Sequence, residues 1–194
     1  MYVGYSWLED GDKMIQVYTG NGKGKTTAAL GLALRAAGAG LKVYIGQFVK
    51  GRFYSELNSL KKIKNIKVEQ FGRSCFIKKV PKGEDLKPRG HGLTSYGQSQ
   101  GLARKGLEKV EKILADKAYD IVILDEINIA LKLKLLGLKE VIRLIENTPE
   151  KTELILTGRD AAPEILKLAD LVSEIKEVKH YYNKGVKARK GIES

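Results

Sequence analysis

The chain has 194 residues, of which 43% are hydrophobic and 30% charged, and its net charge is +12. This composition is typical of a globular protein, and the length suits one domain over residues 1–194. The single cysteine, Cys75, excludes an intrachain disulfide and favours a reducing cytoplasm. No apolar run approaches the ~20 residues of a membrane helix, and the acidic start is unlike a signal peptide. The positive charge favours anionic partners, although a lysine-rich solvated surface explains most of it.

Apolar strand-like runs and amphipathic helix-like runs alternate along the chain. The expected strands cover 14–19, 41–49, 66–71, 121–124, 153–157 and 171–178, the last at an edge. The expected helices cover 26–37, 55–63, 94–117, 138–146 and 162–168. Repeated strand–helix units predict an α/β fold with a mostly parallel sheet, helices on both faces and a basic C-terminal tail.

A glycine-rich loop follows the first expected strand. It comprises Thr19, Gly20, Asn21, Gly22, Lys23, Gly24, Lys25, Thr26 and Thr27. The backbone N–H groups of such a loop converge on one point, and the next helix directs its positive end there, which is typical of triphosphate binding. Lys25 adds a full charge, and Thr26 offers a hydroxyl to Mg²⁺. In the G-x-x-x-x-G-K-[ST] pattern the first glycine falls at Thr19, whereas here Gly20 follows one position late.

Two acidic residues, Asp125 and Glu126, end the apolar run 121–124. This is the Walker B arrangement, in which a buried strand delivers a carboxylate to the metal beside the phosphate loop. Either residue can hold Mg²⁺, and Glu126 is also a candidate general base for activating water.

Arg159 follows the expected strand 153–157, at the edge of the sheet where ligands of open α/β folds bind. An arginine there can neutralise phosphate charge, and a surface ion pair with Asp160 is the equally weighted alternative. His91 and His180 have no neighbouring metal ligands, so we expect polar loop histidines and no zinc site.

Four sequence blocks span roughly residues 13–193, and they read YTGNGKGKTTAALGLALRAAG, YIGQFVKG, DIVILDEI and TGRDAAPEILKLADLVSEIKEVKHYYNKGVKARKGIE. Together they resemble the ATP:corrinoid adenosyltransferases of the cobalamin pathway, and the last block is the most specific. The resemblance implies a RecA-like P-loop fold, a homodimer, and ATP and Mg²⁺ as co-substrate and cofactor. It also implies transfer of the 5′-deoxyadenosyl group of ATP to the Co(I) centre of a reduced corrinoid, with release of triphosphate.

The resemblance also implies roles for individual residues. The loop from Thr19 to Thr27 cradles the phosphates, with Asn21 near the nucleoside. Lys25 and Arg159 neutralise charge and, with Thr26, form the catalytic set. Thr26 binds Mg²⁺ together with Glu126 or Asp125.

Some family members place a phenylalanine and a tryptophan after the third strand to exclude the lower cobalt ligand. Here Phe76 and Ile77 stand in that region without a tryptophan, and they are the candidate corrinoid-facing residues. The resemblance further implies an electron-donating reductase as partner, a cytoplasmic location, and neither a nucleic-acid nor a membrane partner.

Two other functions remain open from the residues alone. The positive charge and the Asp-Glu pair also suit a RecA-like ATPase that is stimulated by nucleic acid, although no platform of aromatic and basic residues for stacking bases is evident. A nucleotide-binding regulatory protein without catalysis is the second alternative.

Overall fold

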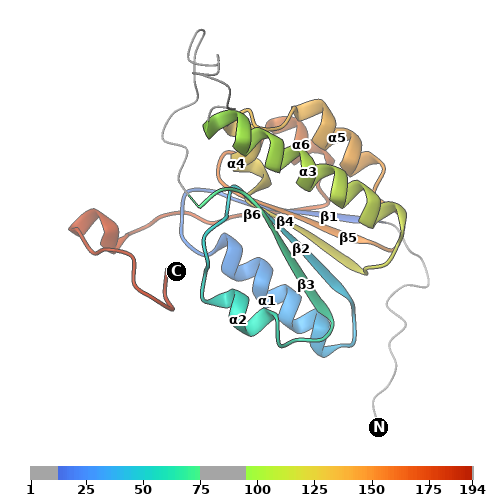
Figure 1. Cartoon of the computed structure of the whole chain (residues 1–194). Helices are drawn as coiled ribbons and strands as arrows, with labels where there is room; N and C mark the ends of the chain where they lie inside the picture. The colour runs from blue at the N-terminus through green and yellow to red at the C-terminus, as the bar shows by residue number, and fades with distance from the viewer. Residues whose placement is uncertain (1–12, 75–94, 194) are drawn as a thin grey trace.

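The computed structural model describes residues 13–74 and 95–193 and contains one six-stranded sheet with helices on both faces (Figure 1). All pairings within this sheet are parallel, and the strand order is β3-β2-β4-β5-β1-β6. The strands are β1 (Met14–Thr19), β2 (Val43–Phe48), β3 (Ile66–Phe71), β4 (Ile121–Asp125), β5 (Glu153–Thr157) and β6 (Leu171–Glu174). The helices are α1 (Lys25–Gly38), α2 (Glu56–Leu60), α3 (Ser95–Ala115), α4 (Ile127–Lys132), α5 (Leu138–Glu146), α6 (Pro163–Leu168) and the 3₁₀ turn η2 (Tyr181–Lys184).

Two hydrophobic layers hold the helices on the sheet. Helices α1 and α2 lie on one face, and α3, α4, α5 and α6 lie on the other (Figure 1). Strand β4 serves both layers, because Ile121 and Ile123 pack with the α1 side whereas Val122 and Leu124 pack with the α3 side. A strand buried on both faces requires a continuous apolar run, which is the pattern that predicted it.

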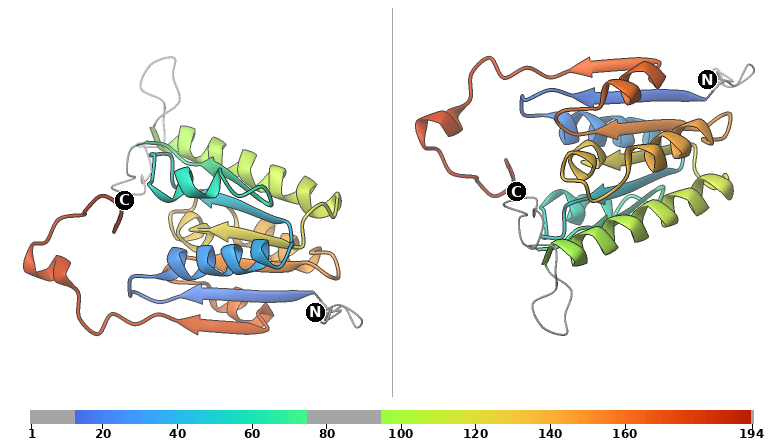
Figure 2. Two further views of the ribbon diagram at one scale, coloured as in Figure 1. Left: turned by 90° about the horizontal axis from the view of Figure 1, so that it is seen from below. Right: turned by 90° about the horizontal axis from the view of Figure 1, so that it is seen from above.

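The parallel arrangement brings the carboxyl ends of all the strands to one edge of the sheet. The loops after β1, β2, β4 and β5 therefore open on the same side. The chain after β6 loops out beyond this edge and curves back toward it (Figure 2). Ligands of open α/β sheets bind at this edge, so the fold places the phosphate loop and the Asp-Glu pair at a common site.

The predicted α/β class with a parallel sheet is confirmed, and β1, β3, β5 and α5 begin and end where the sequence predicts. The edge strand is confirmed as well, but it ends at Glu174 and not at residue 178. Helix α4 was not predicted, because it has only six residues and follows the Asp-Glu pair directly. Phe76, Ile77 and His91 lie outside the described residues. None of the described helices combines the length and apolar character needed to cross a membrane.

Close packing at one glycine fixes how α3 sits on the sheet. A Cβ atom on Gly106 would lie 2.6 Å from Cγ and 2.8 Å from Cβ of Phe71 in β3. Gly101, in the same helix, is exposed and has nothing within 4 Å of such an atom. Gly106 therefore serves packing, whereas Gly101 only weakens the helix.

We expect Gly101→Ala to stabilise the protein, and Gly106→Ala to destabilise it or leave its stability unchanged. Overpacking at Gly106 costs about 1–3 kcal/mol, which exceeds or cancels the helix-propensity gain of about 1 kcal/mol. At Gly101 only the gain applies, so the free energy of unfolding rises by up to about 1 kcal/mol. Urea denaturation of both variants measures this, and equal shifts would contradict the packing role of Gly106.

Candidate active site

The phosphate loop is tied by its backbone to the segment that follows β6. The N–H of Gly22 donates to the carbonyl of Ile175 at 2.7 Å, and the N–H of Ile175 donates to the carbonyl of Thr19 at 2.9 Å. A Cβ atom on Gly20, which has φ of 93°, would lie 2.5 Å from the Ile175 oxygen. Thr19 itself still belongs to β1 and pairs with Glu174. The displaced glycine of the motif is thus explained, because the chain after β6 passes over positions 20 and 22.

We expect Gly22→Ala to weaken nucleotide binding by roughly tenfold. The added Cβ would lie 2.8 Å from the oxygen of Ile175 and from the carbonyl of Lys176, so the two segments must separate. Overpacking of about 1–3 kcal/mol would then disturb the loop that faces the ligand. Calorimetric titration with ATP measures the effect, and Gly31→Ala in α1, which has nothing within 4 Å, is the matched control. Equal affinity in both variants would contradict this account.

Lys25 stabilises the loop from inside. Its Nζ donates to the carbonyls of Gly20 at 2.8 Å and Gly22 at 2.7 Å, and only 7% of the residue is exposed. Burial, reinforced by the charge of Arg159, lowers the pKa of the Lys25 ammonium. Without a bound phosphate, backbone oxygens therefore hold the ammonium inside the loop. The oxygens of an anionic ligand can replace these backbone oxygens as its acceptors.

Asp125 is the buried acceptor at the centre of the site. Its side chain is fully buried, and Oδ1 accepts from the hydroxyls of Thr26 at 2.9 Å and Thr157 at 2.7 Å. Oδ2 accepts from Nε2 of Gln47 at 3.3 Å and from Nζ of Lys50 at 2.7 Å. Four neighbours, from α1, β2, β5 and the turn after β2, thus fix the carboxylate, which is how a buried charge is tolerated.

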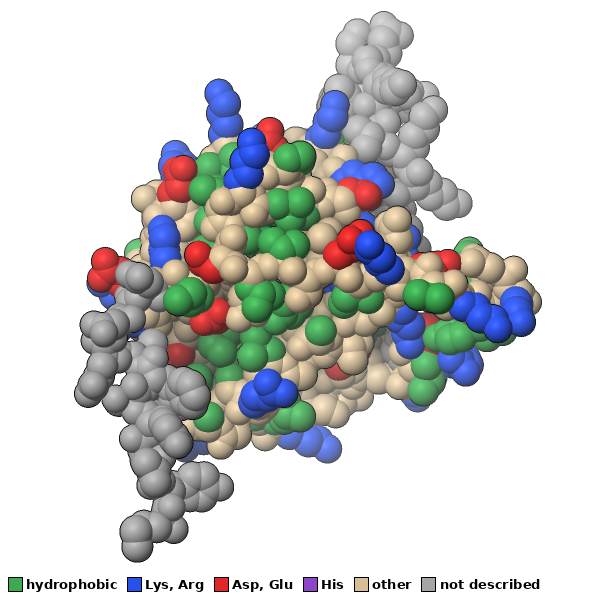
Figure 3. Space-filling view, turned by 180° about the vertical axis from the view of Figure 1, so that it is seen from behind, with side chains coloured by type: hydrophobic (Ala, Val, Ile, Leu, Met, Phe, Trp, Pro, Cys, Tyr) green, Lys and Arg blue, Asp and Glu red, His purple; other side chains and the backbone are tan. Residues whose placement is uncertain are grey.

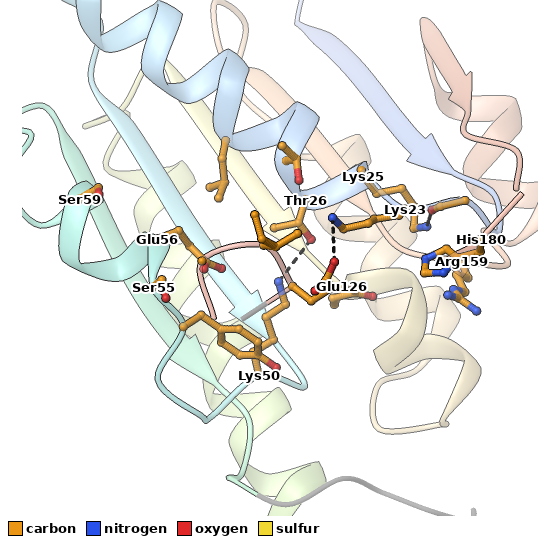
Figure 4. Close-up of a pocket in the computed structure, with 18 residues that line it drawn as sticks. Lys23, Lys25, Thr26, Lys50, Ser55, Glu56, Ser59, Glu126, Arg159 and His180 are labelled. Carbon is orange, nitrogen blue, oxygen red and sulfur yellow. Dashed lines mark hydrogen bonds and ion pairs between the residues drawn. The ribbon is translucent and has the colours of Figure 1, made fainter. Parts of the chain in front are cut away.

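Lys50 is the cation that balances Asp125. Their side chains are 14% and 1% exposed, and the Lys50 ammonium also lies 3.3 Å from the hydroxyl of Thr26 (Figure 4). Burial disfavours the charged ammonium, but Asp125, Glu126 and Glu56 together outweigh it, so the net effect raises the pKa of Lys50. Lys50 was not among the predicted site residues, although it lies in the block YIGQFVKG, two residues after the carboxyl end of β2.

Glu126 lies beside this pair in a strained backbone conformation. Its φ is 62°, in the left-handed region that non-glycine residues seldom adopt, and its N–H donates to the Thr157 hydroxyl at 3.0 Å. Burial and the neighbouring Asp125 raise the pKa of the Glu126 carboxyl, against the attraction of Lys50, Lys25 and Arg159. A second carboxylate thus borders the cavity without a direct ion pair among the described residues.

Arg159 lines the same cavity, at the end of β5. Asp160 forms its ion pair with Lys132 at 2.5 Å, so the alternative of an Arg159–Asp160 surface pair does not describe this structure. The guanidinium is therefore available to an anion in the cavity.

The cavity has a volume of about 660 Å³ and is open on one side. Part of its wall comes from the C-terminal segment, including His180 and Glu193. Glu193 accepts from the hydroxyl of Tyr181 and from Arg189, and it pairs with Lys23 of the phosphate loop at 3.4 Å. These donors hold the pKa of the Glu193 carboxyl well below its usual range. The basic tail thus returns to the phosphate loop.

The structure brings most of the predicted site residues together. Those that line the cavity are Gly22, Lys23, Gly24, Lys25, Thr26, Thr27, Glu126 and Arg159. Asp125 does not line the cavity itself, but it accepts hydrogen bonds from Thr26 and Lys50, which do. Thr19, Gly20 and Asn21 belong to the loop but do not line the cavity. Thr157 and Gln47, which orient Asp125, had no role predicted.

A solved structure of a known protein supports the fold class of this chain. A KaiC-like protein of Pyrococcus horikoshii has the same fold with a TM-score of 0.51 and 18% identity, over 87% of this chain and 75% of that one. The chain therefore has the RecA-like P-loop fold. A family model described as ATP:corrinoid adenosyltransferase BtuR/CobO/CobP matches residues 11–194.

Several curated relatives agree with that match. The corrinoid adenosyltransferase of Escherichia coli K12 is 36% identical over 190 residues, which are 95% of this chain and 87% of the relative. The Pseudomonas aeruginosa enzyme is 34% identical over 93% of this chain and 83% of its own length. Corrinoid adenosyltransferase CobA of Salmonella typhimurium is 37% identical over 93% of this chain and 85% of its own length. The chain belongs to the ATP:corrinoid adenosyltransferase family.

Proposed function

We propose that this enzyme transfers the 5′-deoxyadenosyl group of ATP to the cobalt of a reduced corrinoid. Membership of the adenosyltransferase family over residues 11–194 carries the proposal. The phosphate loop, with a cavity of about 660 Å³ at the carboxyl edge of the sheet, supports it as a triphosphate site. We also propose that residues 1–194 form one domain, since the described strands share one sheet.

In this reaction Co(I) attacks C5′ of the ribose, and the cobalt–carbon bond forms with both electrons from the metal. The bond between C5′ and its oxygen breaks, its electron pair leaves with the triphosphate, and cobalt becomes formally Co(III). Charge builds on the departing triphosphate, so fixed cations lower the barrier. We assign this role to Lys25 and Arg159, with the loop from Thr19 to Thr27 holding the phosphates and Asn21 near the nucleoside. Since cobalt is the nucleophile, Glu126 need not activate water.

We also propose a Mg²⁺ site formed by Thr26, Asp125 and Glu126. A positive group already lies between two of these residues, because Lys50 Nζ contacts both Asp125 and Thr26, so their oxygens suit a cation. Hydroxyl and carboxylate oxygens are the ligands that Mg²⁺ prefers. When bound, the ion would neutralise charge on the triphosphate, while Thr157 and Gln47 hold the Asp125 carboxylate in place.

We also propose three partners for the enzyme, namely the corrinoid, a reductase and a second copy of the chain. Phe76 and Ile77 are proposed to face the corrin ring, and a reductase is proposed to supply the electrons in the cytoplasm. A homodimer is proposed as well, and the outer edge of the sheet offers a surface for it. Leu171 and Val172 of the edge strand β6 are 44% and 46% exposed. Hydrophobic side chains also gather on the face of the molecule seen in Figure 3.

Product analysis with ATP and chemically reduced cobalamin tests the proposed function. We expect adenosylcobalamin and intact triphosphate in equal amounts, and no product without the reductant. The competing hypothesis, a nucleic-acid-stimulated ATPase, predicts orthophosphate release that single-stranded DNA accelerates. DNA-stimulated phosphate release without a cobalt–carbon bond would refute the adenosyltransferase, and tight ATP binding with neither product would favour a regulatory protein.

A further inference from the structure

Lys50 occupies the position that a divalent cation would need. Its ammonium lies 2.7 Å from Oδ2 of Asp125 and 3.3 Å from the hydroxyl oxygen of Thr26. These are two of the three oxygen-bearing groups proposed above to bind Mg²⁺. A metal ion and an ammonium cannot occupy the same space between them, so Lys50 must leave before the ion can enter.

The backbone around Lys50 is fixed in an unfavourable conformation. Val49 has φ of 62°, which is a genuine outlier for a β-branched residue. A Cβ atom on Gly51 would lie 2.2 Å from the carbonyl oxygen of Gly72, and one on Gly72 would lie 2.3 Å from the carbonyl carbon of Val49. The turn after β2 is thus packed against the end of β3, and this packing keeps Lys50 at the site in spite of the strain at Val49.

The side chain also has room to turn away from Asp125. Lys50 lines the cavity of the phosphate loop together with Tyr54 and Glu56, and its ammonium lies 5.4 Å from the centre of the Tyr54 ring. The charged groups that act on it are Asp125, Glu126 and Glu56. A four-carbon side chain with its base at the cavity wall can reach a triphosphate in that cavity by rotation alone.

We propose that Lys50 holds the place of the metal ion in the nucleotide-free enzyme, and that the triphosphate of entering ATP draws the Lys50 ammonium away from Asp125, so that the metal ion can bind there. This inference rests on the proposed metal site. Before binding, Lys50 neutralises Asp125, which would otherwise be a buried unpaired carboxylate. After binding, the same lysine supplies a further positive charge to the leaving group. A structural ion pair would instead stay in place in both states.

The first test measures metal binding without nucleotide. Mn²⁺ is titrated into the wild type, Lys50→Gln and the control Lys62→Gln, and free Mn²⁺ is followed by electron paramagnetic resonance. Glutamine keeps a hydrogen-bond donor for Asp125 but removes the competing charge. We expect Mn²⁺ to bind Lys50→Gln at least about tenfold more tightly than the wild type, because removing a like charge next to a cation site favours the ion. Lys62, exposed after α2, should have no effect. Equal affinities in all three proteins would overturn the proposal.

The second test measures ATP binding by calorimetry in the presence of a chelator. Without metal, Lys50→Gln should bind ATP about tenfold more weakly, since one cation of the site is missing. Unchanged affinity would show that Lys50 does not reach the triphosphate, which also overturns the proposal. Lys50→Met, which keeps the length of the side chain without polar atoms, replaces Lys50→Gln if thermal unfolding shows that the latter does not fold.

Different results would refute the proposed metal site and the proposed role of Lys50. If adenosyl transfer by the wild type needs no divalent ion, the metal site itself is wrong. If transfer needs the ion, yet Lys50→Gln gains no affinity for Mn²⁺, only the role of Lys50 is wrong. Adding Asp125→Asn to Lys50→Gln should remove the gained Mn²⁺ binding, and its persistence would place the ion elsewhere.

Discussion

Lys25→Ala is expected to lower adenosyl transfer by about 10²–10³-fold while the protein stays folded. The Lys25 ammonium lies inside the phosphate loop, on the carbonyls of Gly20 and Gly22, and the proposed reaction places negative charge at this point. Alanine removes that charge and lets the loop relax. The fold tolerates the change, because Lys25 begins α1 and alanine is a good helix former. The loss of two hydrogen bonds costs about 1–3 kcal/mol of stability.

Steady-state kinetics with Co(I) cobalamin, together with thermal unfolding, checks this expectation. Lys105→Ala, on the exposed side of α3, controls for the loss of a lysine and should retain full activity. A well-folded Lys25→Ala enzyme with near-normal kcat would exclude the proposed role of the lysine in stabilising the leaving triphosphate.

Strong local patterns allowed most of the fold to be predicted from the sequence. The run Ile121–Leu124 is apolar throughout because both faces of β4 are buried, and Pro149 follows α5 closely. Helix α4 escaped prediction because its six residues follow the Asp-Glu pair directly, without a proline in the first turn such as the one that marks α6, which is equally short. The C-terminal edge strand was predicted too long, since residues after Glu174 leave the sheet ladder and bond to the phosphate loop.

The candidate site was predicted only where a motif marks it. The glycine loop and the Asp-Glu pair are recognisable because their chemistry requires those residue types in that order. Lys50 carries no such mark, since its place depends on the left-handed backbone at Val49, which local sequence disfavours. The motif has its glycine at position 20 and not at 19 because Ile175, about 155 residues further along the chain, packs against position 20. Only the tertiary structure connects the two segments.

Replacing either acidic residue of the site is expected to lower adenosyl transfer, but only Asp125→Ala should also destabilise the protein. Asp125→Ala leaves the Lys50 ammonium buried without its carboxylate and removes the acceptor of the Thr26 and Thr157 hydroxyls. Breaking a buried ion pair in this way costs about 3–5 kcal/mol. At about 2–4 °C per kcal/mol for a chain of this size, the melting temperature should fall by roughly 6–20 °C. Adenosyl transfer should be lost as well.

Glu126→Gln should not show this loss of stability. The raised pKa of Glu126 means that its charged form is disfavoured in the folded protein, so removing the charge should leave stability within about 1 kcal/mol of the wild type or raise it. If Glu126 binds the metal ion, transfer should fall and need more Mg²⁺ to reach half its maximum. A Glu126→Gln enzyme with unchanged Mg²⁺ dependence would leave Asp125 as the sole carboxylate ligand in the proposed site.

A double variant identifies the source of the instability at Asp125. In Asp125→Ala/Lys50→Met the orphaned ammonium is gone, so the loss of stability should be smaller than the sum of the losses in the two single variants, by about 1–3 kcal/mol of coupling. Urea denaturation of the two single variants, the double variant and the wild type gives this coupling energy directly. Strictly additive losses would mean that Lys50 and Asp125 do not stabilise one another, and the charge balance described for the nucleotide-free site would then be wrong.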